Sequence, residues 1–101
     1  MKDLIALNYE GNEVRTVIIN NEPWFVAKDV AEVLDYTWNG TSRIAHVPTQ
    51  WRGVTSVVTP SGEQEMTILS EQGLYFFLGR SDKAKALPFQ IWIAGEKERK
   101  Q

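Results

Sequence analysis

Apolar and β-branched residues recur along this chain in short runs that polar, turn-forming residues interrupt. Four of the runs have the length and composition of β-strands. They form two pairs, residues 4–9 with 14–19 and residues 54–59 with 63–69. The turn-forming residues 10–13 and 60–62 join the members of each pair. The pattern therefore predicts two β-hairpins.

A short strand follows the first hairpin. Asn20 and Asn21 tolerate the left-handed backbone region and predict a tight turn before a strand at residues 22–26. Pro23 lacks a backbone N–H, which leaves two predictions. Either this strand lies at the edge of the sheet, or Pro23 lies at the beginning of the strand.

Residues 27–34 have the spacing of an amphipathic helix. Their apolar side chains fall at i, i+3, i+4 and i+7, namely Ala27, Val30, Ala31 and Leu34. Trp24 and Phe25 directly precede this stripe, and their large apolar area favours burial. We expect the rest of the chain to pack around this corner.

Three further helices are predicted. The first is short, begins near Thr41 and Ser42 as possible N-caps, and ends before Pro48. The second spans residues 71–78 behind Ser70 as its N-cap and ends at Gly79.

The last predicted helix begins near residues 81–82. Its expected apolar stripe consists of Ala84, Leu87, Ile91 and Ala94. Pro88 lies inside the stripe, and a proline within a helix removes a hydrogen bond and clashes with the preceding turn. We therefore expect a kink or a break at Pro88.

Length and composition predict one domain, and the predicted strands and helices give it an α+β fold. The chain has 101 residues, of which 43% are hydrophobic, and its four Trp and zero Cys indicate one core without disulfides. We expect a small antiparallel sheet of two hairpins and a short strand, packed against three to five short helices. Residues 1–94 form the domain, and the charged residues 95–101 form a tail that frays.

The sequence favours a cytoplasmic location without membrane contact. It holds no run of about 18 apolar residues and no signal-peptide pattern at its start. The absence of Cys fits a reducing compartment.

Charge is distributed unevenly along the chain. The formal net charge is -2, which argues against strong nonspecific binding to nucleic acid. However, residues 36–62 contain Arg43 and Arg52 and no Asp or Glu, and residues 72–101 contain six Lys or Arg against three acids. An acidic protein of this kind can still present one positive face.

Three stretches resemble the N-terminal domain of the BRO family, in the same order and spacing. They are residues 23–31 (Pro-Trp-Phe-Val-Ala-Lys-Asp-Val-Ala), residues 68–75 (Ile-Leu-Ser-Glu-Gln-Gly-Leu-Tyr) and residues 80–93. Two features depart from the family pattern, Pro88 and the charged ending from Gly95 onward. Both bear on the final helix and leave the first two motifs untouched.

The resemblance implies a function in gene regulation. BRO N-terminal domains are small α+β modules that bind DNA, and in phages they are joined to other domains in antirepressors, which relieve lysogenic repression. It thus implies duplex DNA as a partner, a prophage origin and a bacterial host cytoplasm.

Residue types that support catalysis are scarce. One His and no Cys exclude an ordinary tetrahedral zinc site and a Cys nucleophile. The glycines are too far apart for a nucleotide-binding loop. Glu63 and Glu65 share one face of a predicted strand, where solvation explains them better than acid–base catalysis. The sequence therefore predicts no enzyme activity, no cofactor and no metal.

The candidate DNA contacts lie mainly in the acid-free segment, which mixes phosphate donors with aromatic rings. They are Tyr36, Trp38, Asn39, Thr41, Ser42, Arg43, His46 and Arg52. Backbone N–H groups at residues 40–42, at a helix start, would form an anion pocket beside Arg43. A capped turn with Trp38 folded onto the core fits the same residues equally well.

Further candidates are Lys28, Arg80, Lys83 and Lys85. Lys28 lies on the polar face of the first helix, where a solvated face explains it better than a contact in the major groove does. The other three surround a predicted helix start, where a plain capped helix with solvated Lys is an equal alternative.

Two function classes compete. The first is a DNA-binding module of the antirepressor type, which the motifs and the acid-free segment favour. The second is a protein-interaction module that binds a phage repressor or forms a homo-oligomer, which the overall acidity favours because a negative field slows approach to DNA.

Overall fold

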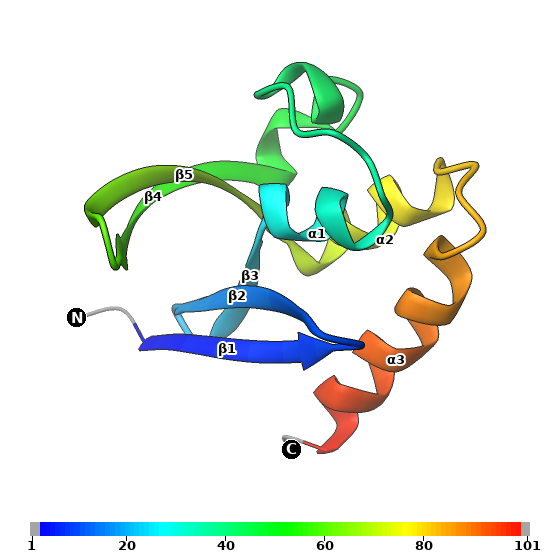
Figure 1. Cartoon of the computed structure of the whole chain (residues 1–101), viewed down its shortest axis with the longest axis horizontal. Coiled ribbons are helices and arrows are strands. Elements are labelled where there is room, and N and C mark those ends of the chain that lie inside the picture. The colour runs from blue at the N-terminus through cyan, green and yellow to red at the C-terminus, as the bar shows by residue number, and fades with distance from the viewer. Residues whose placement is uncertain (1–2, 100–101) are drawn as a thin grey trace.

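Five antiparallel strands and three α-helices make up the fold (Figure 1). The computed structural model describes the backbone of residues 3–99 and the side chains of residues 4–96. The elements are, in order, β1 (Asp3–Tyr9), β2 (Asn12–Ile19), β3 (Glu22–Val26), α1 (Ala27–Val33), the 3-10 turns η1 (Ser42–Ile44) and η2 (Thr49–Trp51), β4 (Arg52–Thr59), β5 (Gly62–Ser70), α2 (Glu71–Gly79) and α3 (Ala86–Arg99). The predicted α+β class, both hairpins and the short strand are confirmed.

The sheet order β1-β2-β3-β5-β4 places the shortest strand in the middle. Pro23 is the second residue of β3, lies opposite Ile18 of β2, and precedes the pairing with β5, which begins at Trp24. Its missing N–H therefore costs no hydrogen bond on the β5 side. Of the two predicted positions for Pro23, the beginning of a strand is confirmed and the sheet edge is wrong.

Tight turns set the register of the first three strands. Glu10 and Gly11 both have positive φ (50° and 84°), as do Asn20 and Asn21 (53° and 65°). Two consecutive residues with positive φ form the type of turn whose twist matches that of paired strands. The first turn is thus two residues long, so β2 begins earlier than the sequence predicted.

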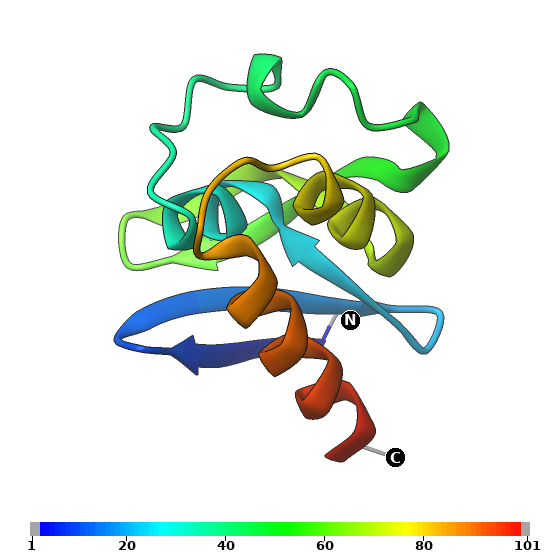
Figure 2. The same cartoon turned by 90° about the vertical axis from the view of Figure 1, so that its right-hand side faces the viewer.

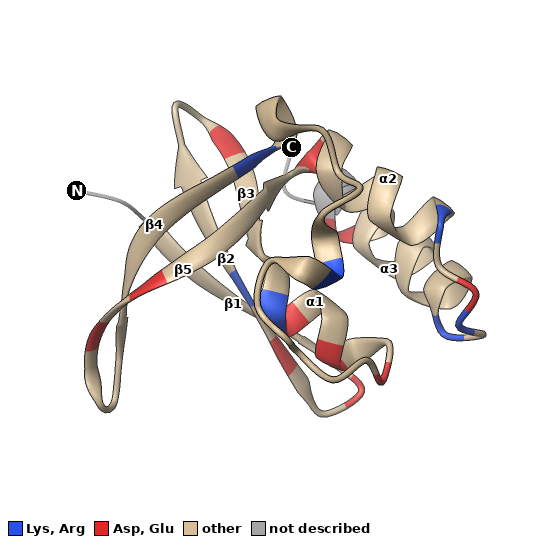
Figure 3. Cartoon of the chain, turned by 90° about the horizontal axis from the view of Figure 1, so that it is seen from above, with Lys and Arg blue, Asp and Glu red and all other residues tan. Residues whose placement is uncertain are grey.

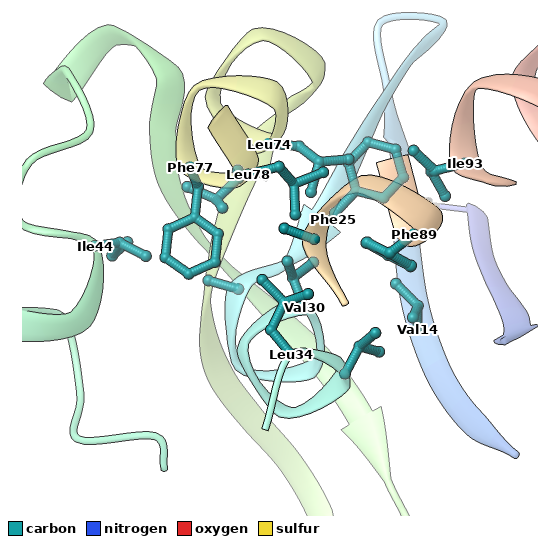
Figure 4. Packing of buried hydrophobic residues seen from close by; sticks show 14 of the residues in the cluster. Val14, Phe25, Val30, Leu34, Ile44, Leu74, Phe77, Leu78, Phe89 and Ile93 are labelled. Atoms are coloured by element: carbon teal, nitrogen blue, oxygen red, sulfur yellow. The ribbon is translucent and has the colours of Figure 1, made fainter. Parts of the chain in front are cut away.

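The main core lies between one face of the sheet and the three helices (Figure 4). All four residues of the predicted stripe of α1 and its following turn are buried, and Phe25 of β3 packs with them. From α2, the inward residues are Leu74, Phe77 and Leu78. The predicted corner of strand and helix is therefore confirmed as a centre of packing.

A smaller set of buried residues lies on the opposite face of the sheet. The register places Ile68 opposite Val26, with Val17 opposite Trp24. Both pairs therefore point away from Phe25, because successive side chains alternate between faces. Val57 of β4 is also buried on this face. Figure 1 shows the hairpins β1–β2 and β4–β5 diverging from each other.

Ser70 caps α2, as predicted. Its side-chain oxygen accepts a hydrogen bond from the backbone N–H of Gly73 at 3.1 Å. A Cβ at Gly73 would lie 2.6 Å from the carbonyl oxygen of Trp51, so only glycine lets α2 approach η2 this closely. The capped start of α2 thereby fixes the segment that leads into β4.

The orientation predicted for α3 is wrong. Its inward residues are Ala86, Phe89 and Ile93, whereas Leu87 is 63% exposed and Ile91 is 66% exposed. The helix carries two apolar stripes, and the one with the larger aromatic area packs inward, where Phe89 and Trp92 contact Tyr9 of β1. Figure 2 shows α3 crossing the β1–β2 hairpin.

The predicted kink at Pro88 is also wrong. Pro88 is the third residue of α3, and the helix continues without interruption to Arg99. A backbone N–H in the first turn of a helix has no partner within the helix, so proline is tolerated there.

The helix also crosses the predicted boundary at residue 94. Fraying of the tail and the boundary itself stay predictions, and residues 100–101 lie outside the described part of the chain. No helix within residues 3–99 is long and apolar enough to cross a membrane.

A buried ion pair joins α1 to β2. The carboxylate of Asp29, which is 5% exposed, accepts hydrogen bonds from the guanidinium of Arg15 at 2.7 and 2.8 Å and from its backbone N–H at 2.9 Å. These bonds raise the pKa of the Arg15 guanidinium above its usual value. The sequence pattern gave no indication of this contact, because the residues are fourteen positions apart.

Candidate nucleic-acid interface

Tyr36 joins the connection after α1 to a segment that is distant in the sequence. Its backbone N–H donates to the carbonyl of Ala31 at the end of α1, which fixes the start of the long connection to β4. Its hydroxyl lies 2.9 Å from the hydroxyl of Ser81 and 3.4 Å from the carboxylate of Asp82. Tyr36 therefore ties this connection to the loop between α2 and α3.

Two cations lie against the ring of Tyr36. The guanidinium carbon of Arg43 is 4.6 Å from the ring centroid, and the ammonium of Lys83 is 5.0 Å from it. Both distances fall within the range of cation–π attraction. Arg43 also donates to the carbonyl of Thr37 at 3.3 Å, and its buried Nε has no hydrogen-bond partner in the described part of the chain.

A second aromatic group continues this surface along α2. Arg80 lies over the ring of Phe76 at 4.7 Å, and the imidazole of His46 stacks on Phe76 and Phe77 at 6.0 and 5.9 Å. Phe77 in turn lies 5.9 Å from the ring of Tyr36. The contacts thus form one cationic–aromatic cluster, which consists of Tyr36, Arg43, His46, Phe76, Phe77, Arg80 and Lys83.

The cluster affects the imidazole of His46. Partial burial lowers its pKa below the usual value, and the nearby positive charge of Arg80 lowers it further. The lowered pKa favours the uncharged imidazole, whose described contacts are the stacked rings of Phe76 and Phe77.

No ion pair of the described side chains involves the cations of the cluster. Among the described residues, the ion pairs are Arg15–Asp29 and Lys85–Asp35. Arg43, Arg80 and Lys83 contact aromatic rings instead, which leaves their charge available to an anion. Figure 3 shows Lys and Arg gathered on the connection between α2 and α3, with one acidic position among them.

The structure brings together five of the predicted site residues, namely Tyr36, Arg43, His46, Arg80 and Lys83. Three other predicted site residues have no described contact with the cluster. Lys28 is exposed on α1, Arg52 begins β4 with a buried Nε, and Lys85 lies 2.8 Å from Asp35. The last hydrogen bond lowers the pKa of Asp35 and raises that of Lys85.

The predicted helix at Thr41 and Ser42 is wrong. The segment forms only the three-residue turn η1, and no side chain caps it. The hydroxyl of Ser42 donates instead to the carbonyl of Asn39, and Thr41 forms an isolated bridge with Asn39. So short a turn has no appreciable helix dipole, which removes the basis for an anion pocket at residues 40–42.

The aromatic residues Trp38, Trp51 and Trp92 are half-buried and pack against the core. Trp51 and Trp92 thus serve core packing, and Trp38 follows the alternative in which it folds onto the core. Phe76 and Phe77 were missed as site residues. For Phe76 the available signal was its position four residues before Arg80, the C-cap of α2, because residues at this spacing lie on the same face of a helix.

No group of three acidic or His residues in the described part of the chain could hold a metal ion. The expected absence of enzyme activity stays a prediction.

Comparison with known proteins places the chain in a family. Residues 13–98 match the N-terminal domain of the BRO family, as the three motifs predicted. An uncharacterized protein of Haemophilus influenzae is 35% identical over 94 residues, which make up 90% of this chain and 46% of the relative. The chain thus spans about half the length of that relative. No solved structure matches it. The chain belongs to the BRO family, whose N-terminal domain it carries.

Proposed function

We propose that this domain binds duplex DNA through the cationic–aromatic cluster and serves as the DNA-binding module of an antirepressor-like protein. The observation that supports this is the gathering of Arg43, Arg80 and Lys83 on aromatic rings rather than on carboxylates. Cations without an ion pair among the described side chains can displace the counterions of phosphates.

The aromatic rings also prepare the site for binding. A long cationic side chain loses rotamer freedom when it grips a phosphate, and this lowers its net contribution. Contact with Tyr36 restricts Arg43 and Lys83 before any ligand arrives. The carboxylate of Asp82, beside the Tyr36 hydroxyl, repels a phosphate. Phosphate contacts are therefore expected on the other side of the cluster.

The overall acidity of the chain does not exclude this function. Surface charges further apart than about 8 Å are largely screened at physiological ionic strength. A phosphate at the cluster therefore senses mainly the three nearby cations and the single carboxylate of Asp82, rather than the net charge of -2. Association is expected to be slow and sensitive to salt.

A variant that combines Arg43→Ala, Arg80→Ala and Lys83→Ala tests the proposal. We expect the slope of log affinity against log salt to become shallower by roughly 2 to 3, because three phosphate contacts are lost. Fluorescence anisotropy with a generic duplex at several salt concentrations measures the slope.

Lys28→Ala is the control, because Lys28 is exposed and has no described contact with the cluster. It should leave the slope unchanged. An unchanged slope in the triple variant, with the fold verified by circular dichroism, would remove the cluster as the DNA-binding surface. Duplex DNA that does not bind to the unmodified domain at low salt would overturn the function itself.

In this proposal the protein acts in the cytoplasm of a bacterial host and relieves repression of a prophage. The family membership and the cationic–aromatic cluster support this role. A reporter under the control of a phage repressor in a lysogen should be derepressed by the full-length protein and not by its triple variant.

A second candidate function is contact with a phage repressor. It is favoured by Leu87 and Ile91, which are both largely exposed and lie one turn apart on the outer side of α3. Leu87→Lys with Ile91→Lys should then abolish derepression in the same reporter while DNA affinity stays unchanged. Full derepression by this variant would exclude the candidate.

A further inference from the structure

β4 is an unprotected edge of the sheet. It runs for eight residues, and within residues 3–99 it pairs with β5 alone. Every second residue of an edge strand directs its backbone N–H and C=O groups outward, where they are available to another strand. Charged residues and prolines usually block such edges, but residues 53–59 contain neither.

The exposed side chains of β4 are apolar. Val54 is 64% exposed and Val58 is 71% exposed, and both lie on the same face of the strand because they are four positions apart. On the opposite face, Thr55 and Val57 are buried within the domain. The face of β4 that carries Thr55 and Val57 is therefore packed against the domain. The face that carries Val54 and Val58 remains exposed.

The position of the hairpin leaves this edge accessible. Figure 1 and Figure 3 both show the far half of the β4–β5 hairpin projecting from the body of the domain. The helices lie toward the other end of the molecule in the same views. A second strand can thus approach β4 without displacing any of them.

The pattern of β4 is symmetric about Ser56. Val54 and Val58 lie two residues to either side of it, and Thr55 and Val57 lie one residue to either side. Antiparallel pairing of two copies about Ser56 would place Val54 opposite the partner's Val58 and Val58 opposite the partner's Val54. Each exposed valine would then face another, and β-branched pairs stabilise neighbouring strands.

We propose that β4 pairs with β4 of a second copy of this chain around a two-fold axis at Ser56, so that the two sheets become one. An interface of this kind uses the same surface on both copies, as symmetric dimers require. The edge offers no charge pattern that would select a different peptide. Its symmetric arrangement of side chains instead makes it complementary to a second copy of the same strand. The proposal is independent of DNA binding, because it shares no residue with the cationic–aromatic cluster.

Repulsion between acidic residues does not prevent this pairing. Glu63 and Glu65 lie on β5, opposite Val58 and Ser56. In the dimer, β5 and its copy are separated by three strand spacings, about 14 Å in total. This exceeds the screening length of about 8 Å at physiological ionic strength, so the charges interact weakly.

The interface is small. Seven paired residues extend over about 24 Å. Contact areas at the low end of the specific range belong to transient complexes, so we expect a dimer that dissociates on dilution.

A single cysteine tests the geometry, because the chain contains none of its own. In the proposed register, Ser56→Cys lies opposite its own copy, and directly opposite residues have Cα atoms about 4.5 to 5.5 Å apart. This distance suits a disulfide. Mild oxidation should therefore give a covalent dimer on a non-reducing gel.

Ser61→Cys is the matched control, since it is an exposed Ser in the turn of the same hairpin but lies far from the axis. It should form much less dimer in the same time. Equal yields from the two variants would mean random collision and would overturn the proposed pairing, as would the absence of dimer from Ser56→Cys.

Sedimentation equilibrium of the unmodified protein over a wide range of concentration provides a second test. The mean mass should rise toward that of a dimer, and Val58→Lys should keep the protein monomeric by adding a charge to the edge. Val58 is largely exposed, so this variant should retain its circular dichroism spectrum. A monomer at all concentrations, or a dimer that persists in Val58→Lys, would contradict the proposal.

Discussion

Replacing Asp29 by alanine is expected to lower the free energy of unfolding by about 3 to 5 kcal/mol, because it leaves the charge of Arg15 without its partner in a partly buried site. The substitution also removes the acceptor of the Arg15 backbone N–H. A small domain is stable by only about 5 to 15 kcal/mol, so a large fraction of its stability depends on this carboxylate. Urea denaturation followed by circular dichroism measures the change.

Glu32→Ala is the matched control for Asp29→Ala. Glu32 is an acidic residue of the same helix, but it is exposed, and its loss should change stability by no more than about 0.5 kcal/mol. A double variant, Arg15→Met with Asp29→Leu, should recover part of the loss, because it removes both charges while the backbone N–H of Arg15 stays without an acceptor. Equal losses in Asp29→Ala and Glu32→Ala would show that the ion pair does not hold α1 to β2.

Replacing Phe89 by alanine is expected to cost about 3 to 5 kcal/mol of stability, the usual range for a buried aromatic residue. Phe89 is fully buried, and its ring meets Tyr9 edge-on at 5.1 Å and lies near-parallel to Trp92 at 6.0 Å. The substitution would open a cavity between α3 and β1 that these rings cannot fill. Denaturation followed by the fluorescence of Trp92 and the other tryptophans should show an earlier midpoint.

Ile91→Ala is the control for Phe89→Ala. The pattern of the sequence alone assigns Ile91 to the core, whereas the structure places it on the outer side of α3. Its replacement should therefore change stability by about 0.5 kcal/mol or less. A greater loss for Ile91→Ala than for Phe89→Ala would show that α3 presents its other side to the sheet.

The charge composition of two segments predicted part of the candidate interface. The acid-free segment directed attention to Tyr36, Arg43 and His46, and the basic run after α2 directed it to Arg80 and Lys83. That these two groups meet on one set of aromatic rings depends on contacts between residues up to 47 positions apart. The same composition also suggested Arg52 and Lys85, because charge along a chain does not reveal which side chains a fold brings together.

Local features were determined by the sequence itself. The hairpins, the stripe of α1 and the cap at Ser70 all arise from interactions within a few residues, so their patterns are visible in a short window. The two wrong predictions at Pro88 and at Thr41 concern where a helix begins and how long it is. Pro88 falls in a first turn that tolerates it, and the residues after Thr41 lack the length for a stable helix.

Sequence alone therefore established the class of fold, the order of most elements and the family resemblance, since each rests on neighbouring residues. Tertiary structure decided which of two apolar stripes of α3 is buried, which carboxylate receives Arg15, and which cations share the ring of Tyr36. Those outcomes depend on competition between distant surfaces for the same core. Periodicity shows that a stripe can be buried, but only packing selects the stripe with the larger contact area.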